Sequence, residues 1–323
     1  MKAVLFGTGW RAHFYIRIAS LLPSLLTISS VYTRSEERKS LILSEGLDAT
    51  TDISAALSAE HDAVIVASGR DGFLPLLEEL EKRGERILTE TSFLPLSDEE
   101  LARAGKIEGF AFEQYLHTPL YSSVMAALGR IGKVSSFYLS ALHNHHAASL
   151  MNAVFPGLEI KDVKRLLEEK AECLKTGTRS GLVRTEEREE YTRKITSVTF
   201  GTGEVFITDF SSNQYHSYII PSRLEIRGEK GVITERGVTY IDGEGYPVSL
   251  PFVFHRDEGK TGQQPSFSHV TLGDVTVFRN RFYPLPLSDD EIAIATMLEE
   301  YADGSLTYTI RKAVDDARVG KLF

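Results

Sequence analysis

The sequence has a single cysteine, no surplus of basic residues and no long apolar run. Because Cys173 stands alone, an intramolecular disulfide and a CxxC metal knuckle are both excluded. Lysine and arginine number 36 against 45 acidic residues, and the resulting net charge of -9 argues against a binder of nucleic acid or anionic membranes. No basic-plus-apolar signal segment opens the chain and no run approaches a membrane-spanning length, so we expect a cytoplasmic protein.

The strongest pattern lies in residues 1–34. An apolar run, Lys2–Phe6, leads into the turn Gly7-Thr8-Gly9-Trp10-Arg11-Ala12, and an amphipathic stretch follows to about Leu22. A second apolar run, Leu26–Tyr32, comes next. Strand, glycine turn, helix and strand stand here in the order that a dinucleotide-binding unit requires. The sequence therefore predicts a nucleotide site, with a plain strand–helix turn as the alternative.

The small residues of this turn have separate tasks. Gly7 permits the tight turn out of the strand, and Gly9 has no side chain to keep a pyrophosphate from the backbone. Ala12 stands where a third glycine often occurs and still lets the helix pack closely on the sheet. The unpaired N–H groups at the helix N-terminus carry partial positive charge and attract phosphate. We expect the whole turn, Thr8, Trp10 and Arg11 included, to contact the coenzyme.

The end of the second strand indicates which coenzyme is bound. An acidic residue there would accept hydrogen bonds from the ribose hydroxyl of NAD and would repel a 2′-phosphate. This chain has Thr33, Arg34 and Ser35 instead, and its next acidic residue is Glu36. Two hydroxyls and the planar donor fork of an arginine suit a 2′-phosphate, so we expect NADP rather than NAD. The alternative is that Arg34 is only a solvated surface residue.

Strand and helix signals alternate over residues 1–117, which predicts a doubly wound parallel sheet, a Rossmann domain. The apolar run 63–67 is suited to a buried parallel strand, and Ser97 with Glu100 resembles a capping box. Strands are expected at 2–6, 26–32, 63–67, 86–90 and 110–112, and helices at 10–22, 36–45, 52–57, 73–83 and from 97.

Residues 118–323 predict a second, α+β domain with a mostly antiparallel open sheet. Helices are expected at 119–128, 147–155, 288–301 and 310–322, and the last of them is able to pack back on the first domain. Strands are expected at 134–142, 195–200, 204–211, 218–227, 232–234, 238–241 and 275–278. The segment 163–174 fits either helix or strand, and 255–272 is expected to be a mobile loop because it is rich in Gly, Gln, Ser and Lys.

The order of these segments resembles that of the Gfo/Idh/MocA oxidoreductases, the glucose–fructose oxidoreductase and inositol dehydrogenase group, over nearly the whole chain. The landmarks are residues 7–12, 63–68, 86–90, 113–119, 129–134, 224–231 and 312–317. The resemblance implies NAD or NADP bound to the first domain and a sugar, polyol or related small molecule oxidised or reduced over the second. It also implies a homodimer or homotetramer formed through the C-terminal sheet.

The chain departs from that family where chemistry is expected. The family usually reads Glu-Lys-Pro at the position of Glu90-Thr91-Ser92, and its lysine polarises oxygen and shuttles protons near the nicotinamide. Thr91 cannot carry a charge. The resemblance still implies that Glu90 and Ser68 lie beside the coenzyme, with Ser68 toward the nicotinamide. The family's Asp-x-x-x-His is absent, since Leu142 stands four residues before His146.

His143-Asn144-His145-His146 is the densest polar cluster in the chain. In the family, the catalytic histidine lies at this junction; His146 fits its spacing best and His145 next. Imidazole suits proton transfer because its ordinary pKa is close to neutrality. The alternative is that these residues cap the following helix. A metal site is another interpretation, because His143 and His145 would share one face of an extended strand. The chain supplies no further ligand motif such as HExxH, however, and zinc needs three or four ligands.

Three other residues complete the predicted site. Tyr115 and His117 follow the carboxyl edge of the first sheet, where doubly wound folds bind ligand. Tyr115 is expected to assist catalysis, or else to be a packing residue. His117, His143 and Tyr215 are expected to contact substrate. The sequence therefore predicts an NADP-dependent oxidoreductase acting on a small polar metabolite, or, because of Thr91, a silent NADP-binding sensor of the same fold.

Overall fold

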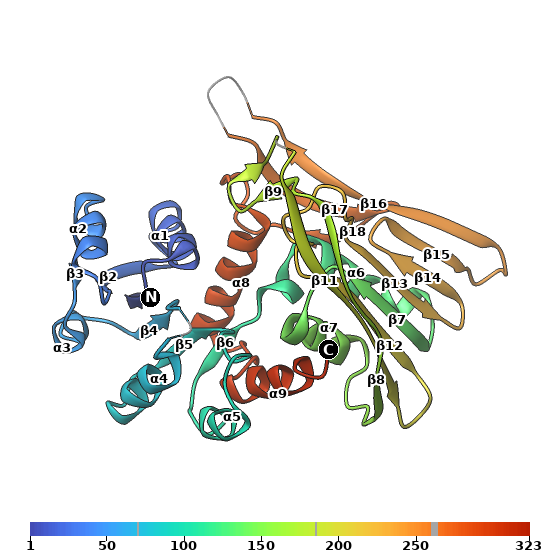
Figure 1. Ribbon diagram of the computed structural model, residues 1–323. Helices are drawn as coiled ribbons and strands as arrows, with labels where there is room; N and C mark the ends of the chain where they lie inside the picture. Colours follow the sequence, from blue (N-terminus) through green and yellow to red (C-terminus); the bar gives the residue numbers. More distant parts are fainter. Residues whose placement is uncertain (70, 185, 260–263) are drawn as a thin grey trace. The chain divides into compact units, whose positions relative to one another are not determined.

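The computed structural model describes residues 1–69, 71–184, 186–259 and 264–323 (Figure 1). The chain forms two compact units, the first made of Met1–Thr118 with Phe282–Arg318 and the second of Pro119–Arg281 with Val319–Phe323. The sequence placed residues 118–323 in the second domain, with the last helix able to pack back on the first, whereas the structure groups the whole segment Phe282–Arg318 with the first unit. None of the described helices combines the length and apolarity needed to cross a bilayer.

The first unit is built on a six-stranded parallel sheet. Its strands run in the order β3-β2-β1-β4-β5-β6, which is the dinucleotide-binding order that the sequence predicts. The strands are β1 (Lys2–Phe6), β2 (Thr27–Tyr32), β3 (Ala49–Thr50), β4 (Ala63–Val66), β5 (Ile87–Glu90) and β6 (Phe110–Phe112). The helices between them are α1 (Trp10–Leu21), α2 (Glu36–Ser44), α3 (Ile53–Leu57), α4 (Phe73–Lys82) and α5 (Asp98–Ala104), and η1 (Gln114–His117) follows β6.

Two late helices, α8 (Asp289–Asp303) and α9 (Ile310–Gly320), explain why residues 282–318 belong to the first unit. Ile310 and Val314 of α9 are buried in the same apolar core as Val4 of β1. On α8, Glu291 pairs with Arg17 of α1 at 2.8 Å. Apolar burial and this ion pair therefore hold segments of distant sequence on one sheet.

The helix starts agree with the capping signals in the sequence. Asp52 accepts a hydrogen bond from the backbone N–H of Ala55 at the start of α3. Ser97 opens α5 and Ser288 opens α8, each in a capping box with the glutamate three residues on. Such caps satisfy N–H groups that a helix cannot pair internally.

The second unit is built on a ten-stranded sheet in the order β18-β17-β16-β15-β14-β13-β7-β12-β11-β8. The pairs are antiparallel except β7 with β12, which are parallel. Helices α6 (Pro119–Ala127) and α7 (Asn144–Val154) pack against it. The strands are β7 (Val134–Ser140), β8 (Ile160–Leu174), β11 (Arg188–Phe200), β12 (Val205–Ser211), β13 (Arg223–Gly228), β14 (Gly231–Thr234), β15 (Gly237–Ile241), β16 (Pro247–Asp257), β17 (Ser266–Leu272) and β18 (Val275–Arg279). A short hairpin, β9 (Gly177–Thr178) with β10 (Gly181–Leu182), stands apart.

The structure corrects several expectations for the second unit and resolves one that the sequence left open. The predicted loop 255–272 includes the end of β16 and all of β17, which pair with each other, while residues 260–263 lie outside the described part of the chain. The ambiguous segment 163–174 is strand β8, paired with β11. The strand expected at 218–227 begins only at Arg223. Helix α7 begins at Asn144, so His145 lies in its first turn and does not share one face of an extended strand with His143.

Candidate functional site

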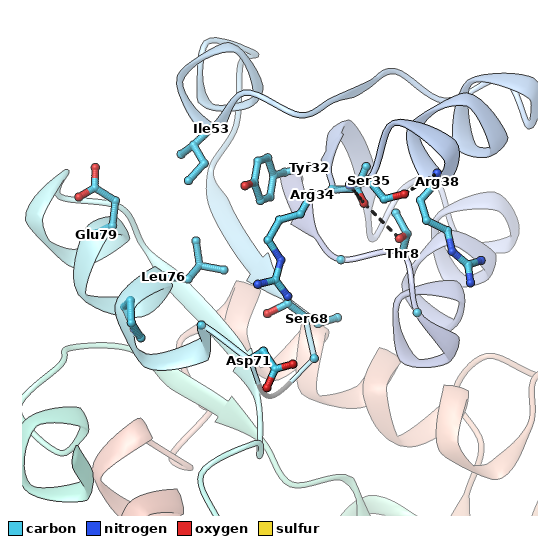
Figure 2. A pocket seen from close by; sticks show the side chains of 17 residues that line it. Thr8, Tyr32, Arg34, Ser35, Arg38, Ile53, Ser68, Asp71, Leu76 and Glu79 are labelled. Atoms are coloured by element: carbon cyan, nitrogen blue, oxygen red, sulfur yellow. Dashed lines mark hydrogen bonds between the residues drawn. The ribbon is translucent and has the colours of Figure 1, made fainter. Parts of the chain in front are cut away.

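A cavity of about 500 Å³ lies at the carboxyl ends of β1, β2 and β4 in the first unit (Figure 2). Six of the ten residues that the sequence assigned to the coenzyme line it: Gly7, Thr8, Gly9, Thr33, Arg34 and Ser68. The volume falls in the range of small-molecule sites. Parallel strands place their carboxyl ends at one edge, which explains why residues from three separate strands meet here.

The two glycines of the turn differ in their surroundings. Gly7 has φ +130°, and a Cβ on it would overlap the carbonyl oxygen of Ala67 at the end of β4. Gly9 is the N-cap of α1 with an extended backbone, and a Cβ on it would meet no protein atom within 4 Å. Gly7 therefore lets two strand ends approach closely, whereas Gly9 leaves open space in front of the helix N-terminus. That open space fits a pyrophosphate against the N-terminus of α1.

Two arginines line the cavity near the end of β2. Arg34 follows the strand, and its Nη1 lies 3.3 Å from where a Cβ on Gly72 would stand, so it reaches across to the start of α4. Figure 2 shows Arg34 extending toward Ser68 and Asp71, whereas Arg38 points elsewhere from the first turn of α2. Ser35 caps α2 by accepting from the backbone N–H of Arg38.

Sequence reasoning missed Arg38 and the apolar side of the cavity. Arg38 stands four residues after Arg34, one turn into a helix whose capping serine is visible in the sequence, and that spacing is the signal that could have found it. Ile53, Pro75 and Leu76 also line the cavity. They come from α3 and α4, which no local pattern links to the glycine turn. Apolar contacts of this kind suit the planar base of a nucleotide.

The other four predicted coenzyme residues do not line this cavity. Trp10 is 56% exposed and packs edge-on against Phe14, and Ala12 lies on the fully buried side of α1. Arg11 pairs with Glu90, its Nε lying 2.7 Å from Oε2. The charges of Arg11 and Glu90 therefore neutralise each other, and neither side chain lines the cavity.

The Arg11–Glu90 pair is buried, with 14% and 11% of the two side chains exposed. Tyr15 donates its hydroxyl to the other carboxylate oxygen of Glu90. Burial, with the nearby charge of Glu90, raises the pKa of Tyr15 well above its ordinary value, so the phenol keeps its proton. The trio ties α1 to the end of β5. Thr91 follows directly and is itself buried.

Tyr115 and His117 lie together in η1 of the first unit. Burial lowers the pKa of the His117 imidazole from 6.5 to about 4. The carboxylate of Glu300 on α8 lies 3.7 Å from its Nε2, beyond hydrogen-bond distance, so burial decides the shift. His117 is therefore neutral at pH 7, and it can offer a hydrogen bond but no charge to a ligand.

The three histidines and Tyr215 come together in the second unit. The hydroxyl of Tyr215 lies 2.7 Å from Nδ1 of His143. The ring centroids of His145 and His146 are 3.9 Å apart, and each lies within about 6 Å of the His143 ring, a spacing at which like charges disfavour one another. These four residues therefore form one cluster, as the sequence predicts for a shared site, although His145 is only 8% exposed.

The backbone at this cluster is held in an uncommon conformation. Asn144 has φ +47°, the left-handed region that few residues other than glycine adopt. A Cβ on Gly320 would overlap the backbone of Asn144 and His145, so only a glycine lets this segment lie against the turn. Strain of this sort is often kept at functional sites because the surrounding structure enforces it.

The sequence matches no protein-family model and no curated protein. Solved structures match over nearly its whole length. One is an oxidoreductase from Agrobacterium radiobacter in complex with NAD+, L-tartaric acid and magnesium, with 12% identity and a TM-score of 0.65, covering 99% of this chain and 94% of that one. Another is a myo-inositol dehydrogenase from Corynebacterium glutamicum, with 14% identity and a TM-score of 0.61, covering 99% and 94%.

A third match is a biliverdin reductase from Synechocystis in complex with biliverdin and NADP+, with 12% identity and a TM-score of 0.60, covering 99% of this chain and 97% of that one. The chain has the fold of these oxidoreductases. This confirms the fold that the resemblance to the Gfo/Idh/MocA group implies, a Rossmann unit followed by a large open sheet. At identities this low, the likeness concerns the fold alone.

Proposed function

We propose that this protein is a nicotinamide-dependent oxidoreductase of the Gfo/Idh/MocA type and that it prefers NADP. The observation that carries the preference is the cationic end of β2, where Arg34 lines the cavity with Thr33 and Ser35 and Arg38 follows on α2. A guanidinium and two hydroxyls suit a phosphate dianion, and Thr33, Arg34 and Ser35 occupy the positions directly after β2 at which an NAD site would carry a carboxylate to accept from the ribose. The matching structures that hold NAD+ or NADP+ support the general class.

The residues of the cavity fit the two phosphate-bearing parts of such a coenzyme. Gly9 and the N-terminus of α1 would hold the pyrophosphate, and Arg34 would hold the 2′-phosphate. The coenzyme, when bound, supplies or accepts the hydride of the reaction. The imidazole cluster at the start of α7 would exchange a proton with a substrate carbon group that bears a hydroxyl, carbonyl or imine.

A titration with NADPH and NADH, followed by quenching of the emission of Trp10, tests the preference. Arg34→Gln removes charge-assisted hydrogen bonds worth about 1.5–3 kcal/mol, so we expect NADPH to bind about 10- to 100-fold more weakly. NADH, which lacks the 2′-phosphate, should bind the variant as it binds the wild type.

Lys39→Gln is the matched control, because it removes one positive charge from α2 at a residue that pairs with Glu36 and does not line the cavity. It should change neither affinity by more than about twofold, since exposed charges are screened by salt. An equal loss of NADH and NADPH binding in Arg34→Gln would contradict the NADP preference. Failure of the wild type to bind either coenzyme would contradict the proposed function itself.

A silent NADP-binding sensor is the second candidate function, and the buried Thr91 favours it. Thr91 stands where the family's lysine carries a charge, and a threonine cannot polarise a substrate oxygen in that way. The two candidates separate in one assay with NADPH and a panel of keto-sugars, diketones and cyclic imines. Consumption of NADPH with any of them supports the enzyme, and tight binding without turnover supports the sensor.

A further inference from the structure

Cys173 is the only cysteine of the chain, and the fold of the second unit places it opposite an acidic residue. It lies near the end of β8, the strand at one end of the ten-stranded sheet, and its partner in register on β11 is Glu189. Residues that pair in register on neighbouring strands have their side chains on the same face of the sheet. A thiol and a carboxylate, which both bind metals when ionised, are therefore neighbours.

A third polar side chain reaches this pair from the turn after β12. The Nδ2 group of Asn213 donates to Sγ of Cys173 at 3.2 Å and to Oε1 of Glu189 at 2.8 Å. The turn is held to the sheet, since the backbone N–H of Ser212 donates to the carbonyl oxygen of Thr192 on β11. One end of the amide thus contacts both the thiol and the carboxylate, and the three groups come from three separate elements.

The other end of the Asn213 amide lacks a hydrogen bond. Asn213 is only 9% exposed, and its Oδ1 is buried with no donor among the residues that the structure describes. Such an oxygen is rare in folded proteins, because it loses its hydrogen bonds to water and gains none in return. In the reverse orientation Oδ1 would face a carboxylate and a sulfur atom, which are both electron-rich. That orientation becomes favourable when a cation lies between the three groups.

The charges and spacings around this pair suit a cation. Within the described ranges Glu189 forms no ion pair, and Lys175, two residues after Cys173, pairs with Glu187 at 2.8 Å. Cys173 and Glu189 are partly exposed, so solvent can reach them. Ligand atoms of a tetrahedral zinc site lie roughly 3.4–3.6 Å apart, because the metal is about 2.3 Å from sulfur and about 2.1 Å from oxygen. The observed spacings of 3.2 and 2.8 Å would have to widen by only roughly half an ångström.

We propose that Cys173, Glu189 and Asn213 form a binding site for a thiophilic divalent cation, with Zn²⁺ as the best fit. The protein ligands are the thiolate sulfur, a carboxylate oxygen and, after a half-turn of the amide, Oδ1 of Asn213; a water molecule completes the tetrahedron. When the metal binds, the S–H bond of Cys173 breaks, the S–Zn bond forms and the proton passes to solvent. The cation joins β8, β11 and the turn after β12, and the site is independent of the proposed function.

The test uses Co²⁺ as the probe, because a thiolate bound to Co²⁺ gives a charge-transfer absorption band that oxygen and nitrogen ligands do not give. Since Cys173 is the only cysteine, the band reports this site alone. We expect the reduced wild type to show the band with Co²⁺ and to lose it when Zn²⁺ is added. Cys173→Ser should abolish the band. Glu189→Gln should raise the dissociation constant of Co²⁺ at least about tenfold, a loss that even outer-shell partners of a metal cause.

Asn213→Asp separates a ligand from a merely structural side chain. A carboxylate cannot donate to Cys173 or Glu189, so without metal this variant should be less stable than the wild type in urea unfolding. Its added negative charge should nevertheless lower the dissociation constant of Co²⁺ at least about tenfold. Glu190→Gln is the matched control, because Glu190 follows directly on β11 and its side chain lies on the opposite face. It should leave the band and the dissociation constant unchanged.

Each part of the proposal can fail by itself. A wild type that gives no charge-transfer band with Co²⁺ would overturn the site. An unchanged dissociation constant in Glu189→Gln would overturn the role of Glu189, and unchanged or weaker binding in Asn213→Asp would overturn that of Asn213. If Cys173→Ser does not fold, alkylation of the wild-type thiol by iodoacetamide decides its role: Zn²⁺ should slow the reaction, and an unchanged rate would contradict the site.

Discussion

His117 gives a prediction about stability and pH. Burial lowers the pKa of its imidazole from 6.5 to about 4, and 24% of its side chain is exposed. Between these two pH values the unfolded chain binds a proton that the folded unit does not bind. Stability therefore falls as the pH is lowered from 6.5 toward 4. This lowering of the pKa corresponds to about 3 kcal/mol in total, of which about 2 kcal/mol is lost between pH 7 and pH 5.

The assay is urea unfolding at pH 7 and pH 5, followed by the emission of Trp10. This is the only tryptophan of the chain, and it lies in the same unit as His117. His117→Gln cannot titrate, so the wild type should lose about 2 kcal/mol more than this variant between the two pH values. His216→Gln, at an exposed histidine, is the control and should follow the wild type. Equal losses in the wild type and His117→Gln would refute the reasoning.

Three further predictions concern glycines and a buried ion pair. In urea unfolding, Gly7→Ala should lower the free energy of unfolding by about 1–3 kcal/mol, because its Cβ would overlap Ala67. Gly9→Ala should leave the free energy of unfolding unchanged, but in a titration it should weaken NADPH binding at least about tenfold. Glu90→Gln should cost about 3–5 kcal/mol in urea unfolding because it leaves a buried guanidinium without its anion; a loss below 1 kcal/mol would contradict this. Gly320→Ala should lower stability by about 1–3 kcal/mol and broaden the His145 resonances, and Gly129→Ala, in open space, should do neither.

The first unit was largely predictable because its signals are local. Strands β1 and β4 contain continuous apolar runs, and serine or aspartate marks the starts of several helices. The assignment of α8 to this unit was missed, since its ion pair between Arg17 and Glu291 joins residues far apart in sequence. The ion pair between Arg11 and Glu90 was likewise missed, because only the fold reveals that the two residues lie next to each other.

The second unit was harder because its long strands carry mixed residues. β17 lies in a segment rich in Gly, Gln, Ser and Lys, and it is a strand because it pairs on both sides with β16 and β18. The candidate cluster was predicted as a group of residues, yet the partner of His143 could not be identified. Tyr215 reaches His143 only through the parallel pairing of β7 and β12, which no local pattern encodes.

Strand β8 forms one end of the ten-stranded sheet, and its sequence bears on aggregation. Along this fifteen-residue strand the outward positions carry Lys164, Glu168, Lys170 and Glu172 between exposed leucines. A long edge strand, paired on one side only, is a template to which another chain can add its own strand, and charged side chains oppose such growth. Replacing these four charged residues with threonine would therefore favour intermolecular strand pairing at this edge of the sheet and promote aggregation.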